Sequence, residues 1–203
     1  MENGSDRKFH MLHYSLTEQL IHGMEVSNLA WDVAGELNIP DDMRHELAVA
    51  GILHDIGKIP LSDYVEEENT LVVEEMKFVR MHSQLGYELL KGKGFSDFIL
   101  DSIHYHHENY DGTGYPSNLS GENIPYGARI LRICDVYCAL TSDRPYRKAF
   151  EKEAAVELMI EEIKNFDIKM FLAFQRAVHN RQQKTVSLEN IDELIREIVT
   201  KRI

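Results

Sequence analysis

Apolar residues recur at helical spacing through most of this chain, and no segment shows the apolar–polar alternation of a β-strand. In the first such stretch, Leu16 and Leu20 are followed by apolar positions between Ala30 and Leu37. Glycine and proline separate the stretches, as Pro40 does here. The pattern predicts an all-α fold of about eight helices. The expected helices begin near residues 15, 41, 70, 96, 125, 151, 167 and 187.

Length and charge exclude several classes of function. The 203 residues suit one substantial domain with a helical appendage. The formal net charge of −12 argues against general binding to DNA or RNA, which requires a basic face. No apolar run approaches the ~20 residues of a membrane span, and the polar segment 1–6 shows no export signal. The two cysteines, Cys134 and Cys138, do not resemble a disulfide framework, so we expect a cytoplasmic protein.

The periodicity indicates three regions along the chain. Residues 1–14 lack clear periodicity and are expected to form a flexible lead-in. Residues 15–180 are expected to form the folded domain. Residues 181–203 are expected to form an amphipathic helix, with Leu188 and Ile195 on its apolar stripe. This helix packs either on the domain or on a partner, such as a second copy of the chain.

An adjacent histidine and aspartate, His54 and Asp55, close the second expected helix. Such a pair binds one divalent metal from both sides, or bridges two metals through the carboxylate. Mixed histidine and carboxylate ligands indicate a first-row metal with hydrolytic or redox chemistry. We expect Gly57 to end the helix and Pro60 to prevent its resumption. Lys58, just past this end, either holds a phosphate oxygen or is a solvated lysine that favours the helix C-terminus.

Further ligand-type residues lie on other expected helices. Glu18 and His22 are four residues apart, so they project from one face. Glu18 is either a metal ligand or part of a capping box that begins at Ser15, and the spacing favours neither. His22 is likewise either a ligand, as its same-face glutamate suggests, or a surface or capped histidine. His82 stands alone in the middle of its helix, where a histidine is more often structural than a ligand.

A cluster of histidines follows the helix that is expected to begin near residue 96. Ser96 is expected to cap this helix, which delivers His104, His106, His107 and Glu108 close together. Two consecutive histidines reach different metals, or one binds a metal while the other faces a substrate.

Asp135 stands among isoleucine, cysteine and valine in the helix that begins near Pro125. A carboxylate in such surroundings is costly to bury without a cation or another partner, which makes Asp135 a metal-ligand candidate. Cys134 and Cys138 are more simply explained as small buried residues, because their spacing is not that of a zinc knuckle.

Residues 142–148 carry the densest positive charge in this acidic chain. Arg144 and Arg147 are spaced so that they fork two phosphate oxygens, a planar recognition for which arginine is suited. The alternative is an exposed, charged helix start. The loop Asp111–Pro116 is rich in turn formers, and Tyr115 adds a ring and a hydroxyl. A structural turn explains this loop equally well.

Taken together, these segments resemble the HD-GYP branch of the HD-domain metal-dependent phosphohydrolases. The resemblance covers roughly residues 15 to 175, and three motifs in the family's order are far more specific than any one of them. The motifs are His54-Asp55-Ile56-Gly57-Lys58, then His106-His107-Glu108-Asn109-Tyr110-Asp111-Gly112-Thr113-Gly114-Tyr115-Pro116, then the stretch from Asp135 to Arg147. The resemblance implies an all-helical HD fold that hydrolyses cyclic di-GMP, with iron or manganese as cofactor.

The resemblance also implies a role for each matching residue. Glu18 occupies the place of a ligand found in members with three metals, which favours the ligand interpretation over the capping box. Lys58 matches a phosphate-contacting lysine, and Tyr115, Arg144 and Arg147 match positions that hold the cyclic dinucleotide. The implied ligands of two or three divalent ions are Glu18, His22, His54, Asp55, His82, His106, His107 and Asp135.

The implied mechanism is an in-line attack on phosphorus by a hydroxide that bridges the metals. Asp55 is the carboxylate expected to span two ions, and Lys58 would stabilise the charge on the phosphate together with the two arginines. The expected product is linear pGpG, with GMP as the further product where a third ion permits a second cleavage.

Two departures from the family pattern leave other functions open. Cys138 stands where the family commonly has aspartate, and the acidic run Glu66–Glu68 lies where the family carries Lys-Pro-Gly. One alternative is therefore a phosphohydrolase for another nucleotide, such as cyclic GMP-AMP. The other is a catalytically weak module that binds a cyclic dinucleotide, or docks a diguanylate cyclase through Gly114-Tyr115-Pro116. The complete ligand set argues against this module, because a binding domain does not need every metal ligand.

Overall fold

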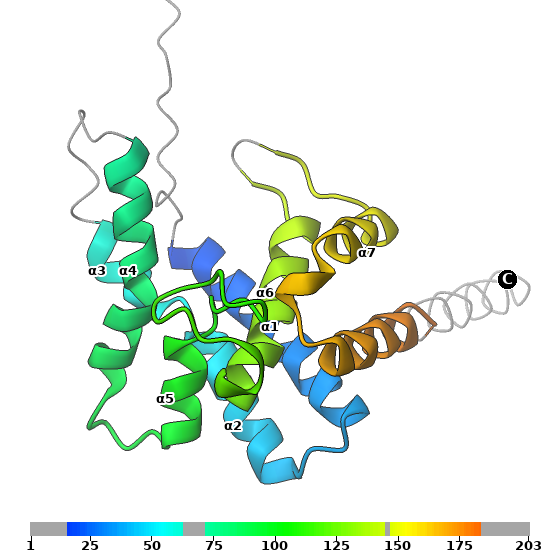
Figure 1. The fold of residues 1–203 in the computed structure, drawn as a ribbon, viewed down its shortest axis with the longest axis horizontal. Helices are drawn as coiled ribbons and strands as arrows, with labels where there is room; N and C mark the ends of the chain where they lie inside the picture. The colour runs from blue at the N-terminus through cyan, green and yellow to red at the C-terminus, as the bar shows by residue number, and fades with distance from the viewer. Residues whose placement is uncertain (1–15, 63–71, 145–146, 184–203) are drawn as a thin grey trace, which may run out of the picture.

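The computed structural model of the chain is all-helical, as the sequence predicts (Figure 1). It describes residues 16–62, 72–144 and 147–183, and these ranges contain no β-strand. None of the helices in these ranges combines the length and the apolar character that crossing a membrane demands. The elements are α1 (Leu16–Glu36), α2 (Asp41–Leu53), η1 (Ile56–Lys58), α3 (Ile59–Ser62), α4 (Val72–Leu90), α5 (Asp97–His104), η2 (Gly121–Asn123), α6 (Tyr126–Thr141), α7 (Lys152–Glu161), η3 (Ile163–Asn165) and the helical residues 168–183.

Three sequence predictions fall outside the described residues. They concern the lead-in 1–14, the acidic run Glu66–Glu68 and the helix expected from residue 187. The boundary between a domain ending at residue 180 and a separate C-terminal helix therefore stays a prediction.

Most helix boundaries follow the sequence pattern, and one local prediction is wrong. Ser96 caps α5, with its side chain accepting a hydrogen bond from the backbone N–H of Ile99. The helix resumes as α3 directly after η1, although we expected Pro60 to prevent this. Pro60 is the second residue of α3, within the first turn, where a missing N–H costs no helical hydrogen bond. α2 ends at Leu53, so His54 and Asp55 lie just beyond its last turn.

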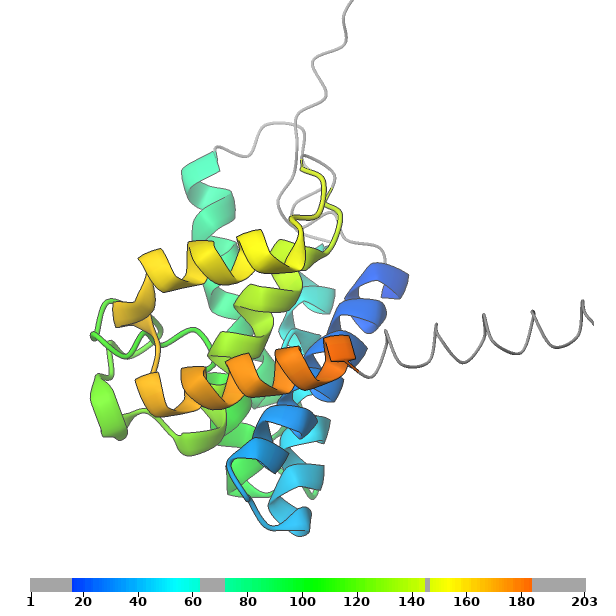
Figure 2. The ribbon, with the colours of Figure 1, turned by 90° about the vertical axis from the view of Figure 1, so that its right-hand side faces the viewer.

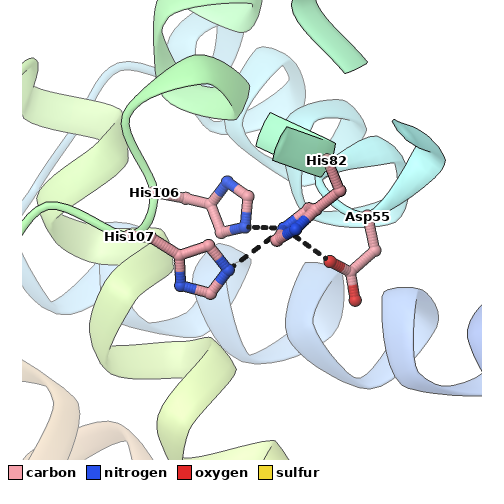
Figure 3. A group of neighbouring side chains, drawn as sticks. All are labelled: Asp55, His82, His106 and His107. Atoms are coloured by element: carbon pink, nitrogen blue, oxygen red, sulfur yellow. Dashed lines mark hydrogen bonds and ion pairs between the residues drawn. The ribbon is translucent and has the colours of Figure 1, made fainter. Parts of the chain in front are cut away.

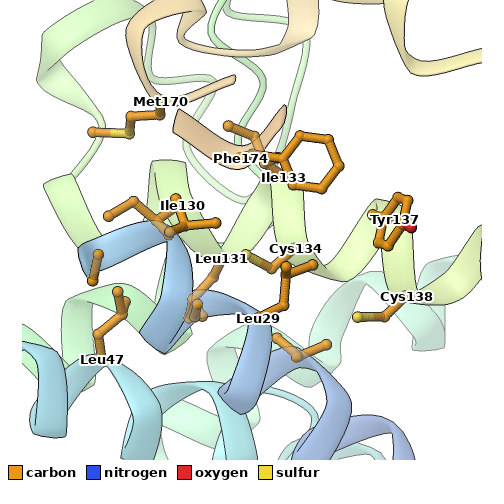
Figure 4. Packing of buried hydrophobic residues seen from close by; sticks show 14 of the residues in the cluster. Leu29, Leu47, Ile130, Leu131, Ile133, Cys134, Tyr137, Cys138, Met170 and Phe174 are labelled. Atoms are coloured by element: carbon orange, nitrogen blue, oxygen red, sulfur yellow. The ribbon is translucent and has the colours of Figure 1, made fainter. Parts of the chain in front are cut away.

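The central helix of the core is α6. Figure 4 shows it between Leu29 of α1 on one side and Met170 and Phe174 of the helical residues 168–183 on the other. Figure 2 shows α7 and residues 168–183 crossing the same region one above the other. Cys134 and Cys138 are buried free thiols in this core, as predicted for small apolar residues.

A close contact between α1 and α2 sets the position of two ligand candidates. Gly51 of α2 packs against the backbone of Ser27 in α1, and a Cβ atom at Gly51 would lie 2.7 Å from the Ser27 Cα. Any larger residue at this point would push the two helices apart. Since His22 belongs to α1 and His54 follows α2, the contact also sets the distance between these imidazoles.

Replacing Gly51 with alanine is therefore expected to lower the free energy of unfolding of the metal-free protein by about 1–3 kcal/mol, the usual cost of overpacking. The matched control is Gly35→Ala in α1, where the new methyl group would meet only the flexible end of Arg44. This control should be neutral or stabilising by up to about 1 kcal/mol, because alanine favours helix more than glycine does. Urea unfolding in the presence of a chelator measures both changes. Equal stability of the two variants would contradict the packing argument.

Candidate metal centre

The helices bring seven of the predicted ligands together in two adjoining groups. Asp55, His82, His106 and His107 form the first group, and His22, His54 and Asp135 form the second. These side chains come from α1, the turn after α2, α4, the turn after α5, and α6. His82 lies at the centre of the first group (Figure 3); its lone position in the helix favoured a structural role, whereas the family resemblance implied a ligand.

Short distances join the ligand atoms of the first group. The His82 Nε2 lies 3.2 Å from the Asp55 Oδ1, 3.2 Å from the His106 Nε2 and 3.1 Å from the His107 Nε2. Figure 3 shows the other two imidazoles and the carboxylate converging on this His82 nitrogen. Each ring turns a nitrogen, rather than a carbon edge, toward its neighbours.

Asp135 organises the second group, and Asp55 links it to the first. The Asp135 Oδ1 lies 3.0 Å from the His22 Nε2 and 3.7 Å from the His54 Nε2. The other oxygen of Asp55, Oδ2, lies 3.4 Å from the same His54 nitrogen and 2.6 Å from the Lys58 Nζ. One Asp55 oxygen therefore faces each group, which is the arrangement a bridging carboxylate requires.

Backbone carbonyl groups fix the orientation of three of the histidines. In each, Nδ1 donates a hydrogen bond to the carbonyl oxygen three residues earlier, because a carbonyl only accepts. The proton on Nδ1 leaves the lone pair of a neutral ring on Nε2, the atom that faces the other ligands. The pairs are His54 with Gly51 at 2.8 Å, His82 with Val79, and His106 with Ile103 at 2.6 Å.

Lone pairs on nitrogens about 3 Å apart repel each other unless a proton or a cation lies between them. Two such Nε2 atoms, those of His82 and His106, are 3.2 Å apart, and both rings hold their proton on the opposite side. Among the described residues, the buried His54 Nε2 has no hydrogen-bond partner. These donors fit divalent transition-metal ions, which accept both imidazole nitrogen and carboxylate oxygen.

Burial and mutual charge shift the ionisation of these side chains. Burial lowers the pKa of His54, but the carboxylates of Asp55 and Asp135 outweigh this and raise it to about 10. Burial raises the pKa of Asp55, but the charges of Lys58 and His54 outweigh it and hold that pKa well below the usual range. Burial lowers the pKa of His82 to about 4. Without metal, the centre therefore holds a proton on His54 and none on Asp55.

A second glycine contact brings His82 next to the His–Asp turn. A Cβ atom at Gly57 would lie 2.0 Å from the carbonyl oxygen of His82 and 2.6 Å from the backbone nitrogen of Gly86. Only glycine permits η1 to approach α4 this closely. The glycine of the motif thus sets the separation of Asp55 and His82.

Glu18 belongs to neither ligand group. It is exposed on the first turn of α1 and lines a small adjoining pocket of about 90 Å³ together with His22, Glu25 and Ser142. Its capping-box partner, Ser15, lies outside the described residues. The choice between a ligand and a helix cap at Glu18 therefore stays a prediction.

A larger pocket of about 450 Å³ opens beside the ligand groups. Lys58, Arg144 and Arg147 line it, and their predicted contacts with phosphate stay a prediction. The Arg147 guanidinium also donates to three backbone carbonyl groups, including those of Ala139 and Leu140 near the end of α6. These bonds tie the Arg147 side chain to the end of α6, so Arg147 has a structural role at the rim of the pocket.

Tyr115 lies against the centre rather than in a free turn. Its ring stacks on the His107 ring, with centroids 4.7 Å apart and planes inclined by 24°. The buried Glu108 carboxylate holds the same loop by accepting hydrogen bonds from the backbone N–H groups of Ser117 and Leu119. The sequence analysis placed Glu108 in the histidine cluster but did not predict that it holds this loop.

Arg132 is a pocket residue that the sequence interpretation missed. It lines the large pocket with Lys58 and Asp135, and its Nε donates to the Asn109 Oδ1 at 3.0 Å. Its position three residues before Asp135, on the same face of α6, is the signal that would have identified it.

Metal uptake by the chelator-treated protein is expected to release about one proton at pH 8, because the His54 nitrogen must lose its proton before it binds metal. The release should fade as the pH rises through about 10, where His54 is already neutral. Calorimetric titration with Mn²⁺ in buffers of different ionisation enthalpy measures it. His54→Gln should abolish this component, whereas exchange of the exposed His179 for glutamine should leave it intact. Uptake without proton release at pH 8 would contradict the assignment.

Comparison with known proteins places the chain in one family. A family model described as "HD domain" matches residues 5–170. The cyclic di-GMP phosphodiesterase PA4108 of Pseudomonas aeruginosa is 40% identical over 160 residues, covering 78% of this chain and 39% of the relative. The 3′3′-cGAMP-specific phosphodiesterase 3 of Vibrio cholerae is 32% identical over 149 residues, covering 72% of this chain and 32% of the relative. The chain thus spans about a third to two fifths of the length of these relatives.

The fold is also similar to that of Bd1817, an HD-GYP-type protein from Bdellovibrio bacteriovorus. The TM-score is 0.65 at 20% identity, and the similarity covers 82% of this chain and 55% of the other. The family model spans most of the chain. The His54–Asp55 pair lies where the two ligand groups of the structure meet. The chain therefore belongs to the HD domain family, and its relatives confirm the predicted resemblance to the HD-GYP branch.

Proposed function

We propose that the protein is a metal-dependent phosphodiesterase that hydrolyses cyclic di-GMP to linear pGpG and, where three ions bind, further to GMP. The observation that carries the proposal is the pair of ligand groups joined by Asp55, beside a pocket lined by lysine and arginine. A pocket of about 450 Å³ falls within the range of small-molecule sites. The similarity to a cyclic di-GMP phosphodiesterase supports this choice of substrate.

The two ligand groups would hold two divalent ions, most simply iron or manganese, which accept mixed histidine and carboxylate ligands. Such ions lower the pKa of bound water and neutralise the charge that develops on the phosphate. The protein itself contributes fixed ligands, because its histidine rings are oriented by backbone carbonyl groups.

Lys58 serves the reaction in two ways. Its Nζ lies 2.6 Å from the Asp55 Oδ2, so it orients the bridging carboxylate. It also lines the pocket, so its charge is available to a non-bridging phosphate oxygen. Arg144 borders both the large pocket and the small pocket beside Glu18, so its charge is available to a phosphate bound in either. Tyr115 holds the His107 ring in place by stacking.

A second substrate is favoured by a specific observation. A relative named for 3′3′-cGAMP is 32% identical, and this chain carries Cys138 where the HD-GYP pattern commonly has aspartate. Competition between cyclic di-GMP and cyclic GMP-AMP in one reaction decides between the two. A homodimer, a diguanylate cyclase docked on Gly114-Tyr115-Pro116 and a cytoplasmic location stay predictions.

The Asp55→Asn variant tests the proposed function. It keeps the size of the side chain but removes the charge that both ligand groups share, so metal content should fall and hydrolysis of cyclic di-GMP should drop by at least about a hundredfold. Asp42→Asn, on the exposed first turn of α2, is the matched control and should keep both. Metal analysis of anaerobically purified protein and product chromatography provide the readouts. Full hydrolysis by a metal-depleted Asp55→Asn protein would sink the assignment, and tight binding of cyclic di-GMP without turnover would indicate a binding module.

Metal stoichiometry tests the role of Glu18. Glu18 and His22 are one helical turn apart and line the same small pocket, which supports a third ion there. We expect three ions per chain in the wild type and two in Glu18→Gln, with GMP formation lost and pGpG formation kept. Two ions in both proteins would remove Glu18 from the ligand set.

A further inference from the structure

Arg132 is a cationic residue of α6 that lines the large pocket. It lies on the same face of α6 as Asp135, three residues earlier, and it is half-buried. The preceding arginine on this face, Arg129, pairs with the Asp167 carboxylate at 2.7 Å. Arg132 has no carboxylate within ion-pair distance among the described residues. Its charge therefore stays available to the pocket that it lines together with Lys58.

A hydrogen bond at Nε fixes the orientation of the Arg132 guanidinium. Its Nε donates to the Asn109 Oδ1 at 3.0 Å, which is its one side-chain hydrogen bond within the described ranges. The two terminal nitrogens carry four of the five N–H donors of an arginine. These donors are available to an acceptor that enters the pocket, and phosphate oxygens match the planar fork of a guanidinium.

A chain of hydrogen bonds sets the amide of Asn109. Asn109 Nδ2 donates to the Thr113 Oγ1 at 3.0 Å, and the Thr113 hydroxyl donates to the Asp111 Oδ1 at 2.6 Å. Because Thr113 uses its proton on Asp111, its oxygen is free to accept from the amide nitrogen. The amide nitrogen of Asn109 is thereby turned toward Thr113 and its oxygen toward Arg132.

The guanidinium is close to the metal side of the pocket rather than to its outer rim. Burial and the neighbouring His106 and His82 lower the pKa of His107, and the charge of Arg132 acts in the same direction. It also lies near Asp135 and Tyr115, with which it interacts electrostatically. A phosphate bound at the ligand groups would thus have Arg132 beside it, in addition to Lys58.

We propose that Arg132 is a further substrate-binding residue, which donates through its terminal nitrogens to an oxygen of the phosphodiester that is cleaved, and that Asn109 is the residue that positions it. This inference rests on the proposed phosphodiesterase function. It predicts that the contribution of Arg132 is the same for any phosphodiester, whatever the rest of the molecule.

The experiment compares Arg132→Gln with wild type on cyclic di-GMP and on bis(p-nitrophenyl) phosphate, which has a single phosphate. Loss of the charged hydrogen bonds should lower kcat/KM on both substrates by roughly tenfold to a hundredfold, at unchanged metal content. Arg132→Lys should lose less, because it keeps the charge but not the planar fork. The matched control, Arg129→Gln, should lower the unfolding midpoint while keeping kcat/KM.

Binding gives a readout that does not depend on turnover. The chelator-treated Arg132→Gln protein should bind cyclic di-GMP more weakly than chelator-treated wild type. The single variant Asn109→Ala should show part of this loss of binding. The double variant should bind no more weakly than Arg132→Gln alone, because the two residues act as one unit. Additive losses would show that Asn109 acts independently and would overturn its positioning role.

The outcomes separate this inference from the function on which it rests. Wild-type levels of kcat/KM and binding in Arg132→Gln, with an active wild type, would overturn the inference alone. A loss confined to cyclic di-GMP would also overturn it, since Arg132 would then contact a part of the nucleotide away from the cleaved phosphate. A wild type that hydrolyses neither substrate when loaded with metal would overturn the proposed function, while the binding comparison would still test Arg132.

Discussion

The hydrogen bond from a histidine Nδ1 to the carbonyl oxygen three residues earlier is the interaction on which the metal centre depends. It occurs at His54, His82 and His106, and each carbonyl belongs to the helix or turn that carries the histidine. Each imidazole is therefore locked to its own segment, and Nε2 moves only when that segment moves. The packing of the helices therefore determines the positions of the ligand nitrogens. Glycine contacts at Gly51 and Gly57 determine how closely those segments approach.

This arrangement places like charges and lone pairs together in the absence of a cation. A neutral set of inward-facing nitrogens would be repulsive, and two ionised carboxylates would be costly to bury. In the metal-free protein a proton on His54 relieves part of this conflict, since Asp55 and Asp135 raise its pKa to about 10 against the effect of burial. A divalent ion would relieve more, because it serves several donors at once. Folding thus prepares a site whose own electrostatics favour a cation.

The sequence predicted the fold class and the ligands better than the pocket, and the reason is physical. Helical periodicity depends on neighbours along the chain, and a carboxylate such as Asp135 stands out because its apolar surroundings make burial costly without a partner. The hydrogen bond between Asn109 and Arg132 joins a loop to α6, so neither residue stands out in the sequence by itself. The helical spacing around His82 gave no support for a ligand, because its partners lie on other segments such as η1, which packs against α4. Arg147 was expected in the pocket, but its backbone partners were not.

One loop supplies both the metal side and the phosphate side of the proposed site. His106 and His107 begin it, Asn109 orients Arg132, and Tyr115 returns to stack on His107. The buried Glu108 carboxylate ties the start of this loop to its end through the backbone of residues 117 and 119. A displacement of the loop would therefore move two ligands together with Asn109, the hydrogen-bond partner of Arg132. In the proposed site, metal binding and phosphate binding would therefore be coupled, because one loop carries two ligands and the residue that orients the arginine.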